Sequence, residues 1–170
     1  MAEPDNTQEH LAQLRQAVLS DPTCGSSRYN YALALLAQNR FDEAQKELEE
    51  TIKCSPTLAE AYVLMGGICM EKNDLDGCLA YNQQAVDARD DFAQGYANIG
   101  FVHLQKGNVE EAIAALEKAV GIHPEFLQAY TNLGSAYLMR GQVEDSIAAN
   151  EKALSIEPAF AVAHNNLAIA

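Results

Sequence analysis

The chain has 170 residues, of which 48% are hydrophobic, and its formal net charge is −13. A chain of this length can bury a substantial core, either in one compact domain or in a short array of repeats. Binding to nucleic acid or to an anionic membrane surface is disfavoured, because the nonspecific part of such binding needs clustered Lys and Arg. The acidity favours solubility first, and neutral to basic partners second.

Residues 1–10 contain no basic segment followed by an apolar run. No window of the chain approaches the roughly 20 apolar residues that a membrane-spanning helix needs. We therefore expect a cytoplasmic protein that does not insert into membranes. The four cysteines have neither metal-ligand spacing nor the density of a disulfide scaffold, so we expect free, mostly buried thiols and no metal or other cofactor. They are Cys24, Cys54, Cys69 and Cys78.

The chain repeats with a 34-residue period, which separates Pro22 from Pro56 and Pro124 from Pro158. Asp90 occupies the position at which the series lacks a proline. The period divides the chain into four full units and the beginning of a fifth. These are residues 25–58, 59–92, 93–126 and 127–160, followed by 161–170.

Before the first full unit, residues 1–24 contain a helix-length segment, Asn6 to Ser20, that matches the second half of a unit. Its apolar positions are Leu11, Leu14, Ala17 and Val18. Repeat arrays need covered ends, so we expect this segment to be a helix that caps the N-terminal end of the array.

Each full unit contains two segments of helix length separated by a turn. The turn residues are Asn or Gly, which can adopt the left-handed conformation that ends a helix. They are Asn39, Asn73, Gly107 and Gly141. A carboxylate follows each turn and suits the positive end of the next helix. The second segment ends before the Pro or Asp of the repeat, so each unit is predicted to be an antiparallel helix pair.

Small residues recur where the two helices of a unit must approach each other. One such position on the first helix holds Ala32, Gly66, Gly100, Gly134 and Ala168. The facing position on the second helix holds Ala44, Cys78, Ala112 and Ser146, and a third position holds Thr51, Ala85, Ala119 and Ala153. Only small side chains at these positions let the helices pack closely.

This pattern resembles the tetratricopeptide repeat (TPR) family over essentially the whole chain from about Asn6. The motif residues of the best unit are Tyr130, Leu133, Gly134, Tyr137, Ser146, Ala153 and Pro158. The resemblance implies an all-α fold, a right-handed α-solenoid of stacked antiparallel helix pairs. It also implies a concave face, lined by the first helices, that receives peptides or partner helices.

Three departures from the family pattern affect local packing. Arg28 replaces the first aromatic residue of the first unit, and Asp90 replaces a proline. Asn82 and Asn150 stand where the family usually has a bulky apolar residue. A fully buried, unpaired amide would cost about 1–3 kcal/mol, so we expect both at the margin of the core, with their amides reaching water or a backbone group.

The candidate binding residues lie on the first helices. Asn30, Asn98, Asn132 and Asn166 share one repeat position, and Leu64 interrupts the series. An amide both donates and accepts hydrogen bonds, so such a series can hold a peptide backbone. The alternative is that these amides bind neighbouring helices. Tyr29, Phe101 and Met139 add apolar side chains suited to anchoring a partner.

The predicted groove has few charges, with Glu60 and Glu71 the clearest candidates. TPR domains that bind the acidic tails of chaperones need Lys and Arg on their first helices to pair with carboxylates. Here Lys72, Lys106 and Arg140 stand beside the turns, where they suit the negative ends of helices. The sequence therefore does not favour that subtype.

No motif for catalysis is present: there is no phosphate-binding Gly loop with Lys, no HExxH helix and no partner set around a nucleophile. We therefore expect a scaffold for protein–protein interaction and no enzyme activity. The alternatives are a substrate-targeting domain of a larger enzyme, such as a glycosyltransferase, and a small secretion chaperone. The half unit at residues 161–170 favours a fragment, whereas the helix near Met1 favours a natural start. His164, Leu167 and Ala168 lack a second helix, so we expect weak self-association through the C-terminal end.

Overall fold

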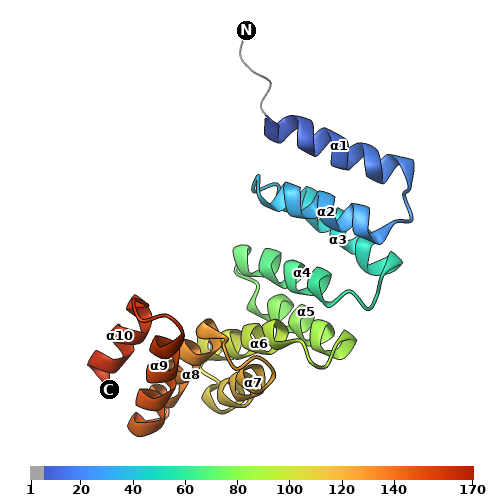
Figure 1. Ribbon diagram of the computed structural model, residues 1–170. Coiled ribbons are helices and arrows are strands. Elements are labelled where there is room, and N and C mark those ends of the chain that lie inside the picture. The colour runs from blue at the N-terminus through green and yellow to red at the C-terminus, as the bar shows by residue number, and fades with distance from the viewer. Residues whose placement is uncertain (1–5) are drawn as a thin grey trace.

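The structure, a computed structural model, describes residues 6–170. Within these residues the chain forms ten α-helices and no strand. They are α1 (Asn6–Ser20), α2 (Gly25–Leu36), α3 (Phe41–Cys54), α4 (Ala59–Glu71), α5 (Leu75–Ala88), α6 (Ala93–Lys106), α7 (Val109–Ile122), α8 (Leu127–Met139), α9 (Val143–Ile156) and α10 (Ala161–Ile169). They stack in chain order into one curved array, with α1 and α10 at its two ends (Figure 1). The predicted all-α solenoid is confirmed.

Four helix pairs make up the body of the array: α2 with α3, α4 with α5, α6 with α7, and α8 with α9. The first helix of each pair begins at the first residue of a repeat unit. The turns between paired helices contain the left-handed residues that the sequence predicts. Asn39 and Asn73 have φ of 58°, and Gly107 and Gly141 have φ of 76° and 79°.

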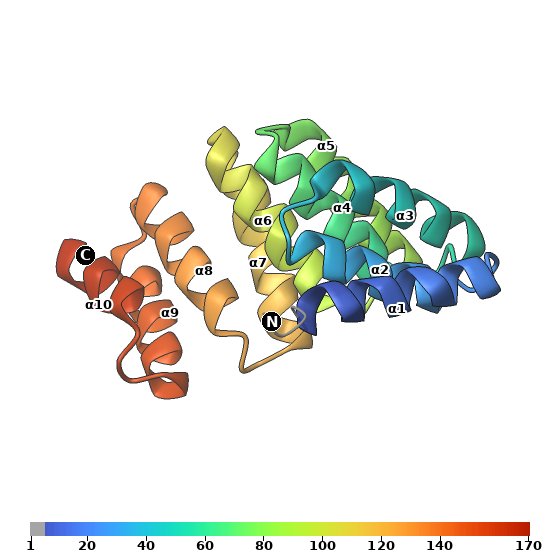
Figure 2. The ribbon, with the colours of Figure 1, turned by 90° about the horizontal axis from the view of Figure 1, so that it is seen from above.

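The first helices lie on the inner side of the curve. From α4 to α10 each first helix contacts the next, whereas contacts between successive second helices are sparser. Viewed from above, α1 lies beside α2 and α10 lies beside α8 and α9 (Figure 2). An array whose first helices are closer together than its second helices is concave on the side of the first helices.

Glycine at the crossing of paired helices allows a close approach. A Cβ atom added to Gly134 would lie 2.1 Å from Nδ2 of Asn150, and one added to Gly66 would lie 2.5 Å from Nδ2 of Asn82. In the third unit, a Cβ on Gly100 would lie 2.5 Å from Cγ of Leu116. The glycines on the first helices therefore leave room for a larger side chain on the second helix of the same unit, which is Asn82, Leu116 or Asn150.

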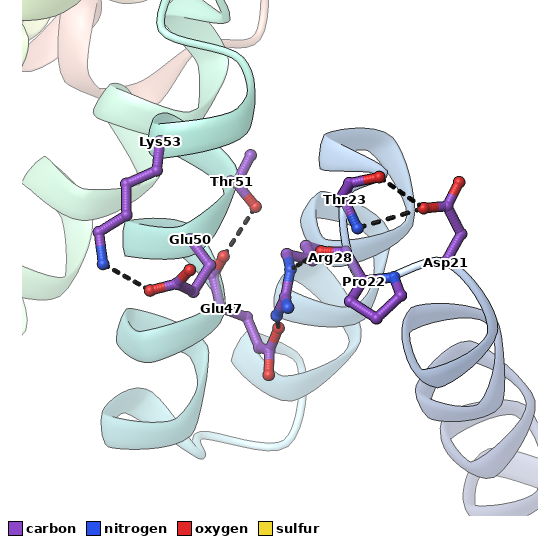
Figure 3. A network of polar contacts seen from close by, with 8 residues as sticks. All are labelled: Asp21, Pro22, Thr23, Arg28, Glu47, Glu50, Thr51 and Lys53. Carbon is purple, nitrogen blue, oxygen red and sulfur yellow. Dashed lines mark hydrogen bonds and ion pairs between the residues drawn. The ribbon is translucent and has the colours of Figure 1, made fainter.

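The connection into the first unit explains Arg28, which stands in place of an aromatic residue. Its Nε donates to the carbonyl oxygen of Pro22 at 2.9 Å, and its Nη1 donates to Oε2 of Glu47 at 2.6 Å (Figure 3). In the second unit the hydroxyl of Tyr62 donates to the carbonyl oxygen of Pro56 at 3.0 Å. Arginine therefore makes the same bond to the preceding connection as tyrosine does.

Two expectations about burial are wrong. Asn82 and Asn150 lie inside the core with 0% of their surface exposed, and not at its margin, although each amide does reach a backbone carbonyl as expected. Of the four cysteines only Cys78 is buried, while Cys54 is exposed and the other two are half-buried. All four are free thiols. None of the helices in residues 6–170 has the length and apolar character that a bilayer-spanning helix requires.

Candidate peptide-binding groove

The Asn series on the inner side divides into two chemically different pairs. Asn98, on α6, donates from Nδ2 to Oδ1 of the buried Asn82 on α5 at 2.9 Å. Asn82 in turn donates to the carbonyl oxygen of Cys78 at 2.8 Å. Oδ1 of Asn98 accepts from Gln94 at 2.9 Å. The amide of Asn98 is therefore engaged in stacking the third unit on the second.

Asn166 has the same role two units further along the chain. Its Nδ2 lies 3.0 Å from Oδ1 of Asn150, which is buried on α9 and donates to the carbonyl oxygen of Ser146 at 2.8 Å. Nδ2 of Asn166 also lies 3.3 Å from the carbonyl oxygen of Thr131 and 3.2 Å from Oγ of Ser135. These contacts hold α10 against α8 and α9.

Asn132 and Asn30 differ, because neither forms a side-chain hydrogen bond to any of the described residues. The buried residue that Asn98 and Asn166 meet on the preceding second helix is an asparagine. At the same sequence spacing before Asn132 and Asn30 stand two leucines, Leu116 and Leu14. Asn132 is half-buried and Asn30 is exposed. The amide atoms of Asn132 are not among the buried side-chain atoms that lack a partner, so solvent can reach both amides.

The sequence contains a signal for this division. An asparagine on a second helix is followed, at the spacing that separates Asn82 from Asn98, by an asparagine on the next first helix. Alignment of the repeat units compares only residues at equal positions, so it does not reveal this relation between unlike positions. The correlation identifies which members of the Asn series are paired.

Leu64, which interrupts the series, has an apolar neighbour at this spacing, as Asn30 and Asn132 do. It packs against the core cluster that contains the fully buried Leu48, which precedes it at the same spacing. Tyr29 packs against the same cluster and is half-buried. These two predicted site residues therefore belong largely to the core.

Phe101 and Met139 remain accessible, with 36% and 57% of their surface exposed. They lie on α6 and α8, which contact each other. Leu33 on α2 is similarly exposed at 39%. The most accessible apolar side chains of the central units are thus on the same two helices as Asn98 and Asn132.

The inner side is nearly uncharged, because α4 is the only first helix that contains acidic residues. Oε1 of Glu60 accepts from Arg89 at 2.8 Å, and its Oε2 is buried without a partner among the described residues. Burial alone would raise the pKa of Glu60, but the hydrogen bonds from its own backbone N–H and from Arg89 have the larger, opposite effect. The net pKa of Glu60 is therefore lowered. Burial, and secondarily the charge of Glu60, raises the pKa of Tyr29.

Two of the three basic residues at the ends of first helices bind the preceding unit, and the third contacts its own helix. Nζ of Lys72 lies 3.1 Å from Oδ1 of Asp42, and Lys106 pairs in the same way with Asp76. Arg140 lies over the ring of Tyr137. These cations are therefore engaged in contacts within the chain. Residues 8–170 bring no three His, Cys, Asp or Glu side chains together in a way that would hold a metal ion.

Comparisons with known proteins agree with this architecture. A family model described as tetratricopeptide repeat matches residues 11–59, 32–93 and 98–162. No curated protein sequence matches the chain significantly.

Among solved structures, the crystal structure of MamA is 23% identical over 90% of both chains, with a TM-score of 0.79. YrrB, a TPR protein with an unusual peptide-binding site, is 18% identical over 95% of this chain and 83% of its own, with a TM-score of 0.74. The first TPR of Spaghetti (RPAP3) bound to the HSP90 peptide SRMEEVD is 19% identical over 66% of this chain and 89% of its own, with a TM-score of 0.65. These likenesses show the fold. With the family model matching most of its length, the chain belongs to the tetratricopeptide repeat family.

Proposed function

We propose that the protein is an interaction module whose inner face binds a largely uncharged, extended peptide segment, with Asn132 as the principal contact to the peptide backbone. The observation that carries the proposal is the state of the Asn132 amide, which is accessible and has no partner among the described residues. An amide of this kind offers a peptide group both a donor and an acceptor. Peptide binding in YrrB and in the RPAP3 domain supports the proposal by analogy of fold.

The apolar side chains on α6 and α8 define what such a peptide would carry. Phe101 is exposed on α6, and Met139 is exposed on α8, the helix that bears Asn132. Aromatic and methionine side chains adapt to apolar ligand groups. The segment bound here would therefore present apolar side chains to the groove and its backbone to Asn132.

The charge distribution argues against an acidic ligand such as the SRMEEVD peptide bound by RPAP3. Lys72 and Lys106 are paired with Asp42 and Asp76, so a ligand carboxylate would have to displace these partners. The acidic residues of the chain are concentrated on second helices and connections, away from the inner face. Affinity should consequently depend little on salt, because ion pairs contribute little to it.

The test is selection of peptides from a random phage-displayed library on the 170-residue chain, followed by titration calorimetry of a selected peptide. Asn132→Ala should weaken binding by about tenfold, since one or two hydrogen bonds of about 0.5–1.5 kcal/mol each are lost. Gln84→Ala, an exposed amide on the second helix α5, is the matched control and should bind normally. Equal affinities of the wild type and Asn132→Ala for the selected peptides would contradict the proposal.

A further inference from the structure

A hollow of about 380 Å³ lies between two successive connections in the middle of the array. One wall comes from the connection between α5 and α6 and the start of α6, and the other from the end of α7 and its connection to α8. Its apolar lining includes Phe92, Ile122 and Phe126, and its polar lining includes Asp91 and Gln94. This volume is at the low end of the range of ligand pockets, so the hollow suits one side chain and not a helix.

At the equivalent place one unit earlier, an arginine of the chain itself occupies the space. Arg89, on the connection between α5 and α6, donates from Nη2 to Oε1 of Glu60 at 2.8 Å. Its guanidinium carbon lies over the ring of Phe92, 4.1 Å from the ring centroid. Arg89 therefore joins this connection to the first turn of the preceding first helix, α4. One repeat later, the residues at the positions of Glu60, Arg89 and Phe92 are Gln94, His123 and Phe126.

His123 does not make the contacts that Arg89 makes. Its imidazole ring stands at 75° to the ring of Phe126, with 5.7 Å between the ring centroids, and its side chain forms no hydrogen bond to a described residue. Gln94 donates from Nε2 to Asn98 at 2.9 Å, and its Oε1 has no donor among the described residues. The hollow therefore keeps an aromatic ring and a side-chain acceptor at the positions that hold Arg89 one unit earlier, but it lacks the guanidinium.

Carboxylates on the two connections make the surroundings of the hollow negative. Asp91 lines it, and both Asp90 and Glu125, on the same two connections, are exposed. None of these three carboxylates forms an ion pair with a described residue. Arg89, the nearest cation along the chain, is already paired with Glu60. A cationic side chain entering the hollow would therefore meet unpaired carboxylates, and the net charge of −13 attracts it at longer range.

We propose that this hollow is a second interaction site, which receives an arginine side chain of a partner protein. The guanidinium takes the place that Arg89 fills one unit earlier: it lies over the ring of Phe126 and donates to Oε1 of Gln94 and to the carboxylate of Asp91. Arginine fits these partners because its planar guanidinium both packs on aromatic faces and carries five N–H donors. The partner therefore presents an arginine on an exposed, positively charged segment.

The hollow shares no lining residue with the groove residues Asn132, Phe101 and Met139, so its occupant does not depend on the groove ligand. The two sites also differ in how they respond to salt. Binding in the hollow relies on attraction between a guanidinium and carboxylates near the surface, which salt screens. Affinity for the hollow should therefore fall as the salt concentration rises, whereas affinity for the uncharged groove should change little.

The test is an NMR titration of the 170-residue chain with the tripeptide N-acetyl-Gly-Arg-Gly-amide. Backbone amide signals of residues 91–94 and 122–126 should shift saturably at millimolar concentrations of the tripeptide. The same tripeptide with citrulline, which has nearly the shape of arginine without its charge, should cause no saturable shift. The spectra also report whether each variant below is folded.

His123→Arg is the decisive variant, because it gives this connection the arginine that Arg89 provides one unit earlier. His123 is exposed, so its replacement does not disturb the core. The new side chain should fill the hollow, and the tripeptide should no longer bind. Conversely, Arg89→Ala uncovers the ring of Phe92 and should create a second site, seen as new saturable shifts in residues 57–60.

Asp91→Asn measures the contribution of charge at the hollow and should weaken binding of the arginine tripeptide several-fold. Glu151→Gln, an exposed change on α9 that alters the net charge equally, is the control and should bind as the wild type does. Three results would overturn the proposal: no saturable shift in residues 91–94 and 122–126 of the wild type, equal shifts with the citrulline tripeptide, or undiminished binding by folded His123→Arg.

Discussion

Two junctions between neighbouring units use the same backbone arrangement with different side-chain chemistry. Between α5 and α6, the buried Asn82 accepts a hydrogen bond from Asn98. Between α7 and α8, the buried residue is Leu116, and Asn132 is left without a partner among the described residues. Asn98 and Asn132 occupy the same repeat position, yet one is committed to stacking and the other is available to a ligand. A repeat position therefore does not by itself assign a function.

The polar junctions also constrain how units can stack. A buried amide is tolerated when its hydrogen bonds are made, and it becomes costly in any arrangement that leaves it unpaired. Asn82 and Asn150 each bind their own helix and the next first helix. The apolar junction at Leu116 imposes no such directional requirement. We therefore expect damage at a polar junction to cost more than the corresponding change at the apolar one.

The largest effect is expected from Gly134→Ala, because the added methyl group would collide with Asn150, the buried residue of the polar junction between α9 and α10. The added Cβ would lie 2.1 Å from Nδ2 of Asn150, displacing an amide that binds both Ser146 and Asn166. Overpacking costs about 1–3 kcal/mol and a disrupted hydrogen bond about 1 kcal/mol, so the free energy of unfolding should fall by about 2–4 kcal/mol. Urea unfolding followed by circular dichroism measures this loss.

Gly67→Ala is the matched control, because Gly67 lies in the interior of α4 with no atom within 4 Å of an added Cβ. It should raise the free energy of unfolding by about 0.5–1 kcal/mol through helix propensity alone. If Gly134→Ala were neutral, the close approach of Asn150 would not be a constraint on this crossing.

The next largest effect separates the two asparagines directly. Asn98→Ala leaves Oδ1 of Asn82 buried without a donor, which should cost about 1–3 kcal/mol. Asn132→Ala removes an amide that faces solvent and should change stability by less than about 0.5 kcal/mol. Thermal melts of the two variants in parallel make the comparison. Equal losses would mean that the series has one role in both units.

Asn82→Leu places a leucine where the junction of α7 and α8 has Leu116, and so tests directly whether Asn98 is needed only because Asn82 is polar. It removes the buried acceptor and leaves Asn98 half-buried, with access to water, so it should cost less than Asn98→Ala. The double variant Asn82→Leu with Asn98→Ala should then be close to Asn82→Leu alone. Additive losses in the double variant would show that the two amides are not coupled.

The sequence predicted the fold well because the fold depends on features that repeat. The period of the repeat, the left-handed turn residues such as Asn73 and Gly107, and the small residues at helix crossings all appear in the structure as expected. Each is a backbone requirement that few residue types can meet, so the residue type reveals it.

The candidate site was less predictable because it depends on pairs of residues. The margin position expected for Asn82 and Asn150 followed from the cost of a lone buried amide, and it overlooked the partner that each has on the next first helix. Which amides of the Asn series are available is decided by the residue behind each of them. The division between Asn98 and Asn132 thus emerges only when both helices of a junction are considered together.

The smallest expected effect concerns the edge of the apolar junction, where α7 and α8 are joined by a polar contact. The hydroxyl of Tyr137 donates to Oε1 of Glu117 at 2.7 Å. Burial, together with this hydrogen bond and the negative charge of Glu117, raises the pKa of Tyr137 from 10.0 to about 12. Below pH 10 the phenol is protonated in both the folded and the unfolded chain, so its stabilising contribution is fully present. As the pH rises from 10.0 to about 12, the unfolded chain loses the proton first, and that contribution is lost.

Tyr137→Phe should therefore be slightly less stable than the wild type below pH 10, and the difference in melting temperature should shrink between pH 10.0 and about 12. Taking the difference between the two proteins cancels the ionisation of all other groups. Glu117→Gln should bring the pKa of Tyr137 back toward 10.0, because it removes the neighbouring charge. A melting-temperature difference that stays constant through this range would mean that neither burial nor the bond to Glu117 raises the pKa of Tyr137 in the folded chain.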